Sequence, residues 1–199
     1  MDTDRRLQIA RAALEVLATA GARGLTHRAV DQAAGLPTGS TSYYYRSRAA
    51  LLDACLADLV RQDQDDLAAL APLLRAGDQA TFADALVDVL HRWVTTERTR
   101  QLARYELFLE AVRRPALAQA LHDGGTTIRR ALADVLAHLG APDAQVRADW
   151  LVAAVDGVVL ERVAGARATE PVDRAALTDV AHWLTRAACT HPSPAPPTP

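Results

Sequence analysis

The residues with the clearest chemical potential lie in one hydroxyl-rich stretch near the start of the chain. Between residues 38 and 44, six side chains carry a hydroxyl group: Thr38, Ser40, Thr41, Ser42, Tyr43 and Tyr44. Small hydroxyls can donate hydrogen bonds to phosphates or read base edges, and tyrosines reach phosphates from the rim of a groove. Gly39 and Ser40 are small enough to let the backbone approach DNA closely. This chemistry is typical of a surface that contacts nucleic acid.

Two short helices are expected to present these hydroxyls. Thr26 is a preferred N-cap residue for a helix that continues to Ala34. Gly35 can then supply the left-handed conformation that ends it, and a second helix is expected over Thr38–Tyr45. Two short helices around a glycine-containing turn form a helix-turn-helix, whose second helix fits a major groove about 12 Å wide. Spacing alone leaves plain helix packing as the alternative.

Helical periodicity dominates the rest of the sequence, and alternating β-branched runs are absent. We therefore expect an all-α fold of eight to ten helices. The first helix should stop near Gly21 and cover Val30, together with Ala33 or Ala34. Ser47 is expected to cap a long fourth helix. The later helices are expected at about 82–93, 102–112, 115–139, 142–166 and 171–189, and the pattern leaves open whether the third of these breaks at Gly124–Gly125.

The charges are divided unevenly along the chain. The first 50 residues carry seven arginines and four acidic residues, whereas the remainder carries 15 arginines and 20 acidic residues. A basic head on an acidic body suits DNA binding at one end. No run approaches the roughly 20 apolar residues of a membrane span, and the N-terminus has no apolar signal region. We therefore expect a soluble, cytoplasmic protein with no membrane partner.

The sequence lacks the patterns on which common enzyme mechanisms depend. It has no nucleophile–base pair, no paired-carboxylate motif and no glycine-rich phosphate loop. The six histidines show no metal-ligand spacing. Cys55 and Cys189 lie in helical patterns, which favours buried thiols over a redox switch. We expect no catalytic residues, metal or cofactor, and an enzyme is the disfavoured alternative.

The stretch from Arg6 to Leu59 resembles the N-terminal domain of TetR-family transcriptional regulators. The positions that match the family pattern are Gly21, Thr26, Val30, Ala34, Gly35, Leu36, Gly39, Ser40, Tyr44, Arg48 and Leu51. The resemblance implies a homodimer whose two heads contact successive major grooves of a near-palindromic, double-stranded operator. It also implies a helix-turn-helix domain over residues 1–47, joined by the long fourth helix to a ligand-binding and dimerisation domain over 48–190. The proline-rich tail, 191–199, is expected to be disordered.

Carried over by position, the resemblance assigns individual contacts. Thr26 and Tyr43 would contact phosphates, and Arg28 would reach a base edge or a phosphate. Arg48 would contact phosphate at the position where the family has lysine. The remaining candidates are Thr38, Gly39, Ser40 and Thr41, which would face the groove, and Tyr44, which is divided between the core and a phosphate. Tyr45 matches an aromatic residue that packs inside.

Three positions depart from the family pattern. Ser42 stands where a DNA-contacting tyrosine is usual, so the phosphate contact is expected to move to Tyr43. Pro37 replaces a common serine cap, which leaves the start of the second helix open by one residue. Asp31 replaces the usual alanine, and we interpret it as part of a solvated helix face. A helical interaction module that has lost DNA binding is a further alternative, and a gel shift with promoter DNA would distinguish it.

The resemblance also implies a pocket for a small-molecule effector and a dimer interface formed by the last two helices. Ala153 and Gly157 are small enough for close helix approach, and Trp183 lies beside an apolar stripe; a monomer is the alternative. Polar and aromatic residues in apolar stretches are pocket candidates. They are His91, Trp93, Arg104, Tyr105, Phe108, His122, Trp150 and Asp156. Tyr105 and Phe108 would suit a hydrophobic or aromatic effector that releases a repressor from its operator.

Overall fold

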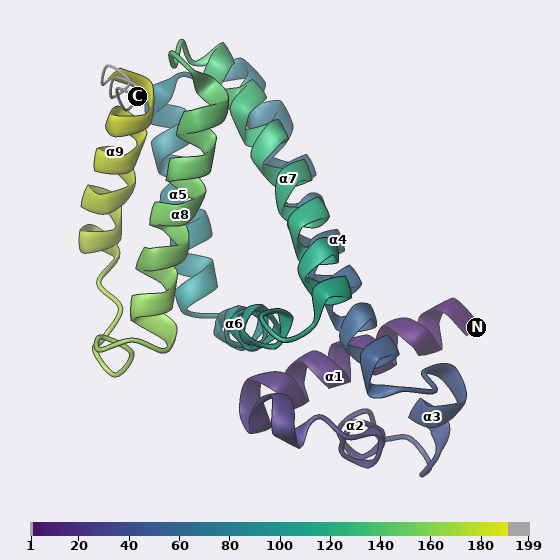
Figure 1. The fold of residues 1–199 in the computed structure, drawn as a ribbon. Helices are drawn as coiled ribbons and strands as arrows, with labels where there is room; N and C mark the ends of the chain where they lie inside the picture. Colours follow the sequence, from purple (N-terminus) through teal and green to yellow (C-terminus); the bar gives the residue numbers. More distant parts are fainter. Residues whose placement is uncertain (1, 191–199) are drawn as a thin grey trace. The chain divides into compact units, whose positions relative to one another are not determined.

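The computed structural model describes residues 2–190, apart from the side chains of residues 70–76 and 190. The described part of the chain is helical and contains no strands, which confirms the all-α expectation. Its nine helices are α1 (Asp2–Gly24), α2 (His27–Ala33), α3 (Ser40–Tyr44), α4 (Arg48–Ala76), α5 (Gln79–Val94), α6 (Arg98–Ala111), α7 (Pro115–His138), α8 (Ala144–Val163) and α9 (Arg174–Thr190) (Figure 1). The expected disordered tail, 191–199, lies outside the described residues.

The helices form two compact units. Unit 1 holds α1, α2, α3, α6 and the first parts of α4 and α7, whereas unit 2 holds α5, α8, α9 and the later parts of α4 and α7. The chain passes between the units after Asp65, Thr95 and Gly125. The two long helices α4 and α7 therefore each contribute to both units, and the expected domain boundary at residue 47 stays a prediction.

The core of unit 1 is built from apolar faces of α1, α4 and α6. Ile9 and Leu17 of α1 are fully buried, as are Leu51 of α4 and Leu107 of α6. Each such side chain contributes about 1.5–3 kcal/mol relative to an exposed one. Val30 of α2 packs into the same cluster, so the small pair α2 and α3 is supported by a much larger apolar core.

The first helix is broken where the sequence predicted its end. Gly21 has a φ of +65°, a left-handed conformation that glycine adopts without steric cost. The helical segment resumes and continues to Gly24. Leu25 follows and is buried in the core of unit 1. The break thus redirects the chain so that α2 begins against the core.

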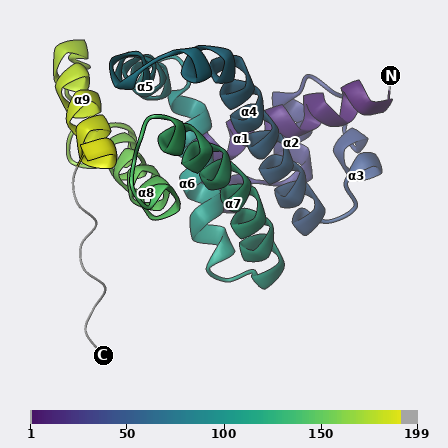
Figure 2. The ribbon, with the colours of Figure 1, turned by 90° about the horizontal axis from the view of Figure 1, so that it is seen from above.

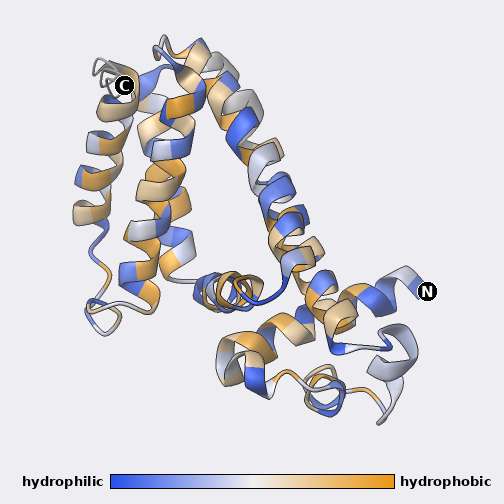
Figure 3. Ribbon diagram, in the orientation of Figure 1, coloured by the Kyte–Doolittle hydropathy of each residue, from blue (hydrophilic) through white to orange (hydrophobic). Residues whose placement is uncertain are grey.

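Unit 2 is a layer of packed helices in which α5 contacts both α8 and α9 (Figures 1 and 2). Its buried apolar side chains include Phe82 and Leu90 of α5, Leu151 and Val155 of α8, and Leu177 of α9. Figure 3 shows hydrophobic residues along most of the length of α8. Because a helix with one buried face needs only one apolar stripe, the wide apolar surface of α8 calls for contact on a second side.

Helix α7 is continuous across the pair of glycines at which the sequence left a break open. A Cβ atom added at Gly124 would lie 2.7 Å from Cγ2 of Val60 on α4, which is closer than side chains pack. Glycine at this position therefore permits a close approach of α7 to α4 within unit 1, and it does not end the helix. No helix among the described residues is long and apolar enough to cross a membrane.

Candidate nucleic-acid interface

Helices α2 and α3 form the helix-turn-helix that the sequence predicted. Thr26 caps α2, because its hydroxyl oxygen accepts a hydrogen bond of 3.1 Å from the backbone N–H of Ala29. Gly35 follows with a φ of +64°, which confirms the expected left-handed turn. The second helix is shorter than predicted, since α3 covers five residues and begins after Gly39, with Pro37 and Thr38 in the turn before it.

Asp31 corrects one expectation, because it does not lie on a solvated helix face. Its side chain is only 3% exposed and points from α2 to the start of α3. The carboxylate accepts hydrogen bonds of 2.7 Å from the backbone N–H groups of both Gly39 and Thr41. Burial acts to raise the pKa of this carboxyl, but hydrogen bonds from Thr41 and Gly39 outweigh it and hold the pKa below its ordinary value. Asp31 is therefore an ionised cap.

The other end of α3 is held by α1 and α2. Arg6 donates a 3.2 Å hydrogen bond to the carbonyl oxygen of Tyr44, and its guanidinium lies over the rings of Tyr44 and Tyr45 at 5.5 Å from each centroid. Nε2 of His27 is 2.7 Å from the carbonyl oxygen of Tyr45. A carbonyl can only accept, so Nε2 carries the proton. Tyr45 packs against the core, as predicted.

The exposed side chains of the pair form the surface that could meet DNA. Tyr43 is 78% exposed, and its ring meets that of Tyr44 edge-to-face at 5.1 Å. Thr26, Arg28, Thr38, Gly39 and Ser42 are also exposed. Ser40 is half-buried, and its hydroxyl donates a 2.7 Å hydrogen bond to the carbonyl oxygen of Pro37. Tyr44 is half-buried and packs against the core.

Thr41 does not meet the expectation that it faces the groove. Its side chain is fully buried, because it points back toward Asp31 and the interior of unit 1. Helical periodicity explains the difference, since adjacent residues on a helix point about 100° apart and a five-residue helix packed on a core must bury one of them. Thr41 thus helps to seat α3. Of the residues expected to face the groove, Thr38 and Gly39 stay exposed and Ser40 is half-buried, and Ser42 is an exposed neighbour that was not among them.

Arg48 is engaged within the protein as well as partly exposed. Its guanidinium donates to the carbonyl oxygen of Ala22 at the end of α1 and forms an ion pair of 3.3 Å with Glu110 of α6. Glu110 also accepts from Arg113 and Arg114, at 3.3 Å and 2.9 Å. The Arg114 hydrogen bond, with those from Arg48 and Arg113, lowers the pKa of Glu110 to about 2 against the opposing effect of burial.

A second carboxylate of α6 holds the broken end of α1. The carboxylate of Glu106 accepts a 2.9 Å hydrogen bond from the backbone N–H of Ala22, immediately after the left-handed Gly21. Glu106 of α6 therefore binds the segment that precedes α2 directly, whereas Glu110 binds Arg48 of α4, which in turn donates to Ala22 of that segment. Sequence reasoning missed these partners, because 84 and 62 residues separate the members of the two pairs and no local pattern marks them.

Comparison with known proteins agrees with this architecture. A family model described as the tetracyclin repressor-like C-terminal domain matches residues 77–187. The chain belongs to the TetR family. It is a TetR-family transcriptional regulator. The N-terminal stretch resembles the family's helix-turn-helix, and the C-terminal part matches the model of the family's C-terminal domain.

Individual relatives extend over nearly the whole chain. The HTH-type transcriptional regulator BetI of Escherichia coli O17:K52:H18 (strain UMN026 / ExPEC) is 26% identical over 190 residues, which cover 94% of this chain and 92% of BetI. A transcriptional regulator from Rhodococcus sp. Rha1 is 25% identical, with a TM-score of 0.77 over 92% of this chain and 95% of that one. The multidrug binding protein EbrR, complexed with ethidium, is 29% identical, with a TM-score of 0.65 over 92% and 99% of the two chains.

The expected effector residues of this TetR-family chain are divided between its units. Arg104, Tyr105 and Phe108 lie on α6 in unit 1, where the last two rings meet edge-to-face at 5.9 Å. Arg104 forms an ion pair of 2.5 Å with Asp63 of α4. His122, on the part of α7 that belongs to unit 1, is exposed. The other four candidates belong to unit 2. Three of them are half-buried, namely His91 and Trp93 on α5 and Asp156 on α8, and Trp150 on α8 is exposed.

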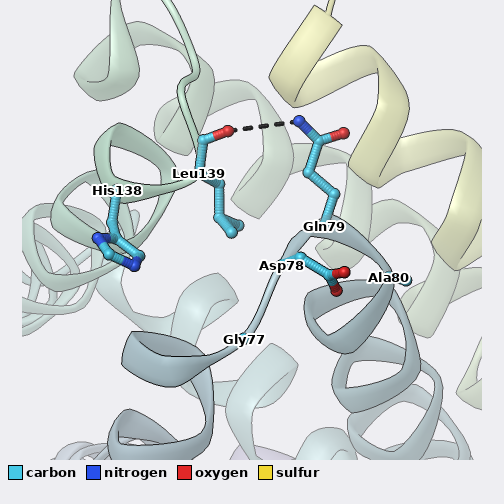
Figure 4. A pocket seen from close by; sticks show the side chains of 6 residues that line it. All are labelled: Gly77, Asp78, Gln79, Ala80, His138 and Leu139. Atoms are coloured by element: carbon cyan, nitrogen blue, oxygen red, sulfur yellow. Dashed lines mark hydrogen bonds between the residues drawn. The ribbon is translucent and has the colours of Figure 1, made fainter.

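Unit 2 contains an open hollow of about 480 Å³ that none of these residues lines. Its walls are the start of α5 and the end of α7, from Gly77 to Ala80 together with His138 and Leu139 (Figure 4). Gln79 spans it by donating a 3.3 Å hydrogen bond to the carbonyl oxygen of Leu139. The hydrogen bond from the backbone N–H of Thr81 lowers the pKa of Asp78, which caps α5. These groups already serve local structure.

The last two helices carry apolar side chains at the surface. On α8 exposed apolar or small residues recur every three or four positions, at Val146, Trp150, Ala153, Gly157 and Leu160. This spacing places them on one helix face, opposite the buried Leu151, Val155 and Val159. On α9, which packs beside α8, Trp183 is 61% exposed. These residues make up what we call the α8–α9 face.

Proposed function

We propose that this protein is a ligand-responsive repressor that binds a near-palindromic operator as a homodimer through α2 and α3. The observation that carries the proposal is the fixed, hydroxyl-bearing helix α3. It spans about 7 Å along its axis, which fits within a major groove about 12 Å wide. Tyr43 and Ser42 project from it into solvent, and Thr38 lies in the turn before it.

The contacts with DNA follow from the exposed groups. We assign phosphate contacts to the hydroxyls of Tyr43 and Thr26, and a phosphate or base-edge contact to Arg28. Thr26 can donate its hydroxyl hydrogen to a phosphate while its oxygen accepts from Ala29. Arg48 retains one-third of its side-chain surface beside its ion pair, so it can approach a phosphate without leaving Glu110. These contacts position the head, and Thr38, Gly39 and Ser42 then lie at the base edges.

The homodimer is assigned to the α8–α9 face. Apolar side chains spaced every three or four residues, with two small residues among them, suit close packing against the same face of a second copy. A homodimer carries two heads, and dimeric helix-turn-helix proteins bind half-sites about 34–36 Å apart along the DNA. Trp150 therefore belongs to the interface in this proposal and not to the effector pocket.

The effector is assigned to the hydrophobic or aromatic class. Two of the structural relatives that support this choice are EbrR complexes, one with ethidium and one with proflavin. The pair Tyr105 and Phe108 offers an edge-to-face aromatic surface on α6. The same helix carries Glu106, which binds Ala22 before α2, and Glu110, which binds Arg48 at the start of α4. A ligand that displaces α6 would thus disturb the seating of the head, which is how we expect DNA to be released.

Binding to the upstream promoter region tests the DNA assignment. Fluorescence anisotropy with that duplex should give saturable binding that weakens steeply with salt, because released counterions dominate such affinities. Tyr43→Phe removes only a hydroxyl and should weaken binding about five-fold. Tyr105→Phe makes the same change on α6 and should leave affinity unchanged without an effector. Equal affinities for Tyr43→Phe and wild type would remove Tyr43 from the interface.

Sedimentation tests the dimer. Trp183→Glu places a charge on the α8–α9 face and should convert the dimer to monomer, because an unpaired charge is costly to bury. Val112→Glu makes a comparable change at another highly exposed apolar position, on unit 1, and should leave the dimer intact. A Trp183→Glu variant that sediments as a dimer would show that the subunits associate elsewhere.

A further inference from the structure

We propose that Asp31 is the positioning residue that sets the recognition helix α3 for operator reading. The proposal rests on the proposed DNA-binding function and adds a residue whose side chain touches no DNA. Asp31 lies on α2, and its carboxylate binds the beginning of α3 through both oxygens. It fixes α3 relative to α2, and thereby fixes where Ser42 and Tyr43 point.

The need for such a residue follows from the length and start of α3. Isolated helices shorter than about 12–15 residues are marginal in water, and α3 has five residues. The first N–H groups of any helix lack partners within it and are usually bound by a side chain at the N-cap. The N-cap of α3 is Gly39, which has no side chain and makes no such bond. The cap therefore has to come from outside the helix.

Asp31 supplies that cap from the preceding helix. One carboxylate oxygen accepts from the backbone N–H of Gly39 and the other from that of Thr41, each at 2.7 Å. Two bonds from one planar group restrain both the distance and the rotation of α3, which one bond would not do. The negative charge also interacts favourably with the positive end of the helix dipole. Arg6 and His27 hold only the carbonyl groups at the far end.

The sign of the charge makes the proposal testable. A carboxylate in a DNA-binding head repels phosphates, so removing its charge should, by electrostatics alone, tighten binding to any duplex. Loss of the cap should have the opposite effect on the operator, because α3 would no longer be held in the orientation that reads bases. The operator and an unrelated duplex must therefore respond differently to the same substitution.

The experiment compares Asp31→Asn with wild type on the promoter duplex and on an unrelated duplex of equal length, at one salt concentration. Asparagine has nearly the same volume as aspartate but only one side-chain oxygen that can accept a hydrogen bond. Its NH₂ group is a donor, so it cannot accept from the second backbone N–H. We expect operator affinity to fall about tenfold and affinity for the unrelated duplex to stay equal or rise. Asp53→Asn removes a charge from an exposed site on α4 and should change both affinities less than two-fold.

Amide hydrogen exchange provides a readout that does not depend on DNA. In Asp31→Asn, the backbone N–H groups of Gly39 and Thr41 should exchange at least several-fold faster, while that of Val30 in α2 should be unchanged. Asp31→Ala should show the same pattern more strongly. Unchanged exchange at Gly39 and Thr41 would overturn the cap whether or not the protein binds DNA.

The two proposals fail in different ways. If wild type binds neither duplex, the DNA-binding function fails, and amide exchange alone decides the role of Asp31. If wild type binds the operator and Asp31→Asn keeps the same ratio of operator to unrelated affinity, the positioning role is overturned. Loss of helical circular dichroism in Asp31→Asn would also overturn it, because Asp31 would then be required for folding and not for orientation.

Discussion

Glu110 offers a quantitative test of how α6 holds the DNA-binding head. Its carboxylate binds Arg48 of α4 together with Arg113 and Arg114, and this lowers its pKa from 4.5 to about 2. This lowering of the Glu110 pKa corresponds to roughly 3 kcal/mol of stability. The three arginine side chains are 34%, 67% and 38% exposed, and solvent screening reduces this contribution. We expect Glu110→Gln to destabilise unit 1 by about 1–2 kcal/mol at neutral pH.

The pH dependence has a definite sign. A carboxyl whose pKa is lower in the folded protein contributes stability that is fully present above its unfolded pKa of 4.5 and lost as the pH falls toward 2. The difference in unfolding free energy between wild type and Glu110→Gln should therefore be largest at neutral pH. Near pH 3 it should have fallen to about half or less.

The chain carries separate optical probes for the two units. All four tyrosines, Tyr43, Tyr44, Tyr45 and Tyr105, belong to unit 1, and all three tryptophans, Trp93, Trp150 and Trp183, belong to unit 2. Urea unfolding followed by tyrosine absorbance should show the loss in Glu110→Gln, and tryptophan fluorescence should show a smaller change. Glu15→Gln, at an exposed site on α1, is the matched control. A destabilisation that is equal at neutral pH and near pH 3 would refute the ion-pair reasoning.

Three further predictions concern residues outside the proposed DNA contacts. Gly21→Ala should lower the stability reported by the tyrosines by about 1–2 kcal/mol, because alanine is strained at a φ of +65°. Gly124→Ala should also destabilise unit 1, because the added methyl would lie 2.7 Å from the stiff side chain of Val60. The expected overpacking cost of about 1–3 kcal/mol exceeds the gain in helix propensity. A rise in the urea midpoint of this variant would contradict the prediction. Burial raises the pKa of Cys55 to about 12, so its thiol should resist alkylation at neutral pH until urea unfolds the chain, and mass spectrometry of labelled peptides would check this.

Short-range capping and turn residues in the sequence determined the helix-turn-helix in outline. Thr26 caps α2 and Ser47 caps α4, each through a side-chain oxygen that accepts an N–H three residues later. Gly35 adopts the left-handed turn that only glycine takes without strain. These features depend on residues within one turn of each other, so their spacing along the chain is sufficient to predict them. The family resemblance drew on the same short-range signals.

Tertiary structure decided which side chains of this stretch are available to DNA. Asp31 and Thr41 read as surface residues in the sequence, but both are buried because α3 packs its first turn against α2. Arg48 was predicted to contact a phosphate, and in the structure its guanidinium also binds Ala22 and Glu110. Burial and long-range pairing depend on which surfaces meet in three dimensions, and the periodicity of a five-residue helix is too short to reveal that.

The body shows the same division at a larger scale. Its amphipathic stripes were sufficient to place α5, α6, α8 and α9, because a buried helix face repeats every three to four residues over many turns. The continuity of α7 was undecidable from Gly124–Gly125, since glycine either ends a helix or permits close packing. The approach of Val60 on α4 settled it. Hydrogen-bonding groups that are close in sequence therefore specified the local helices and turns. Contacts between distant residues decided whether a side chain such as that of Asp31 is buried or exposed.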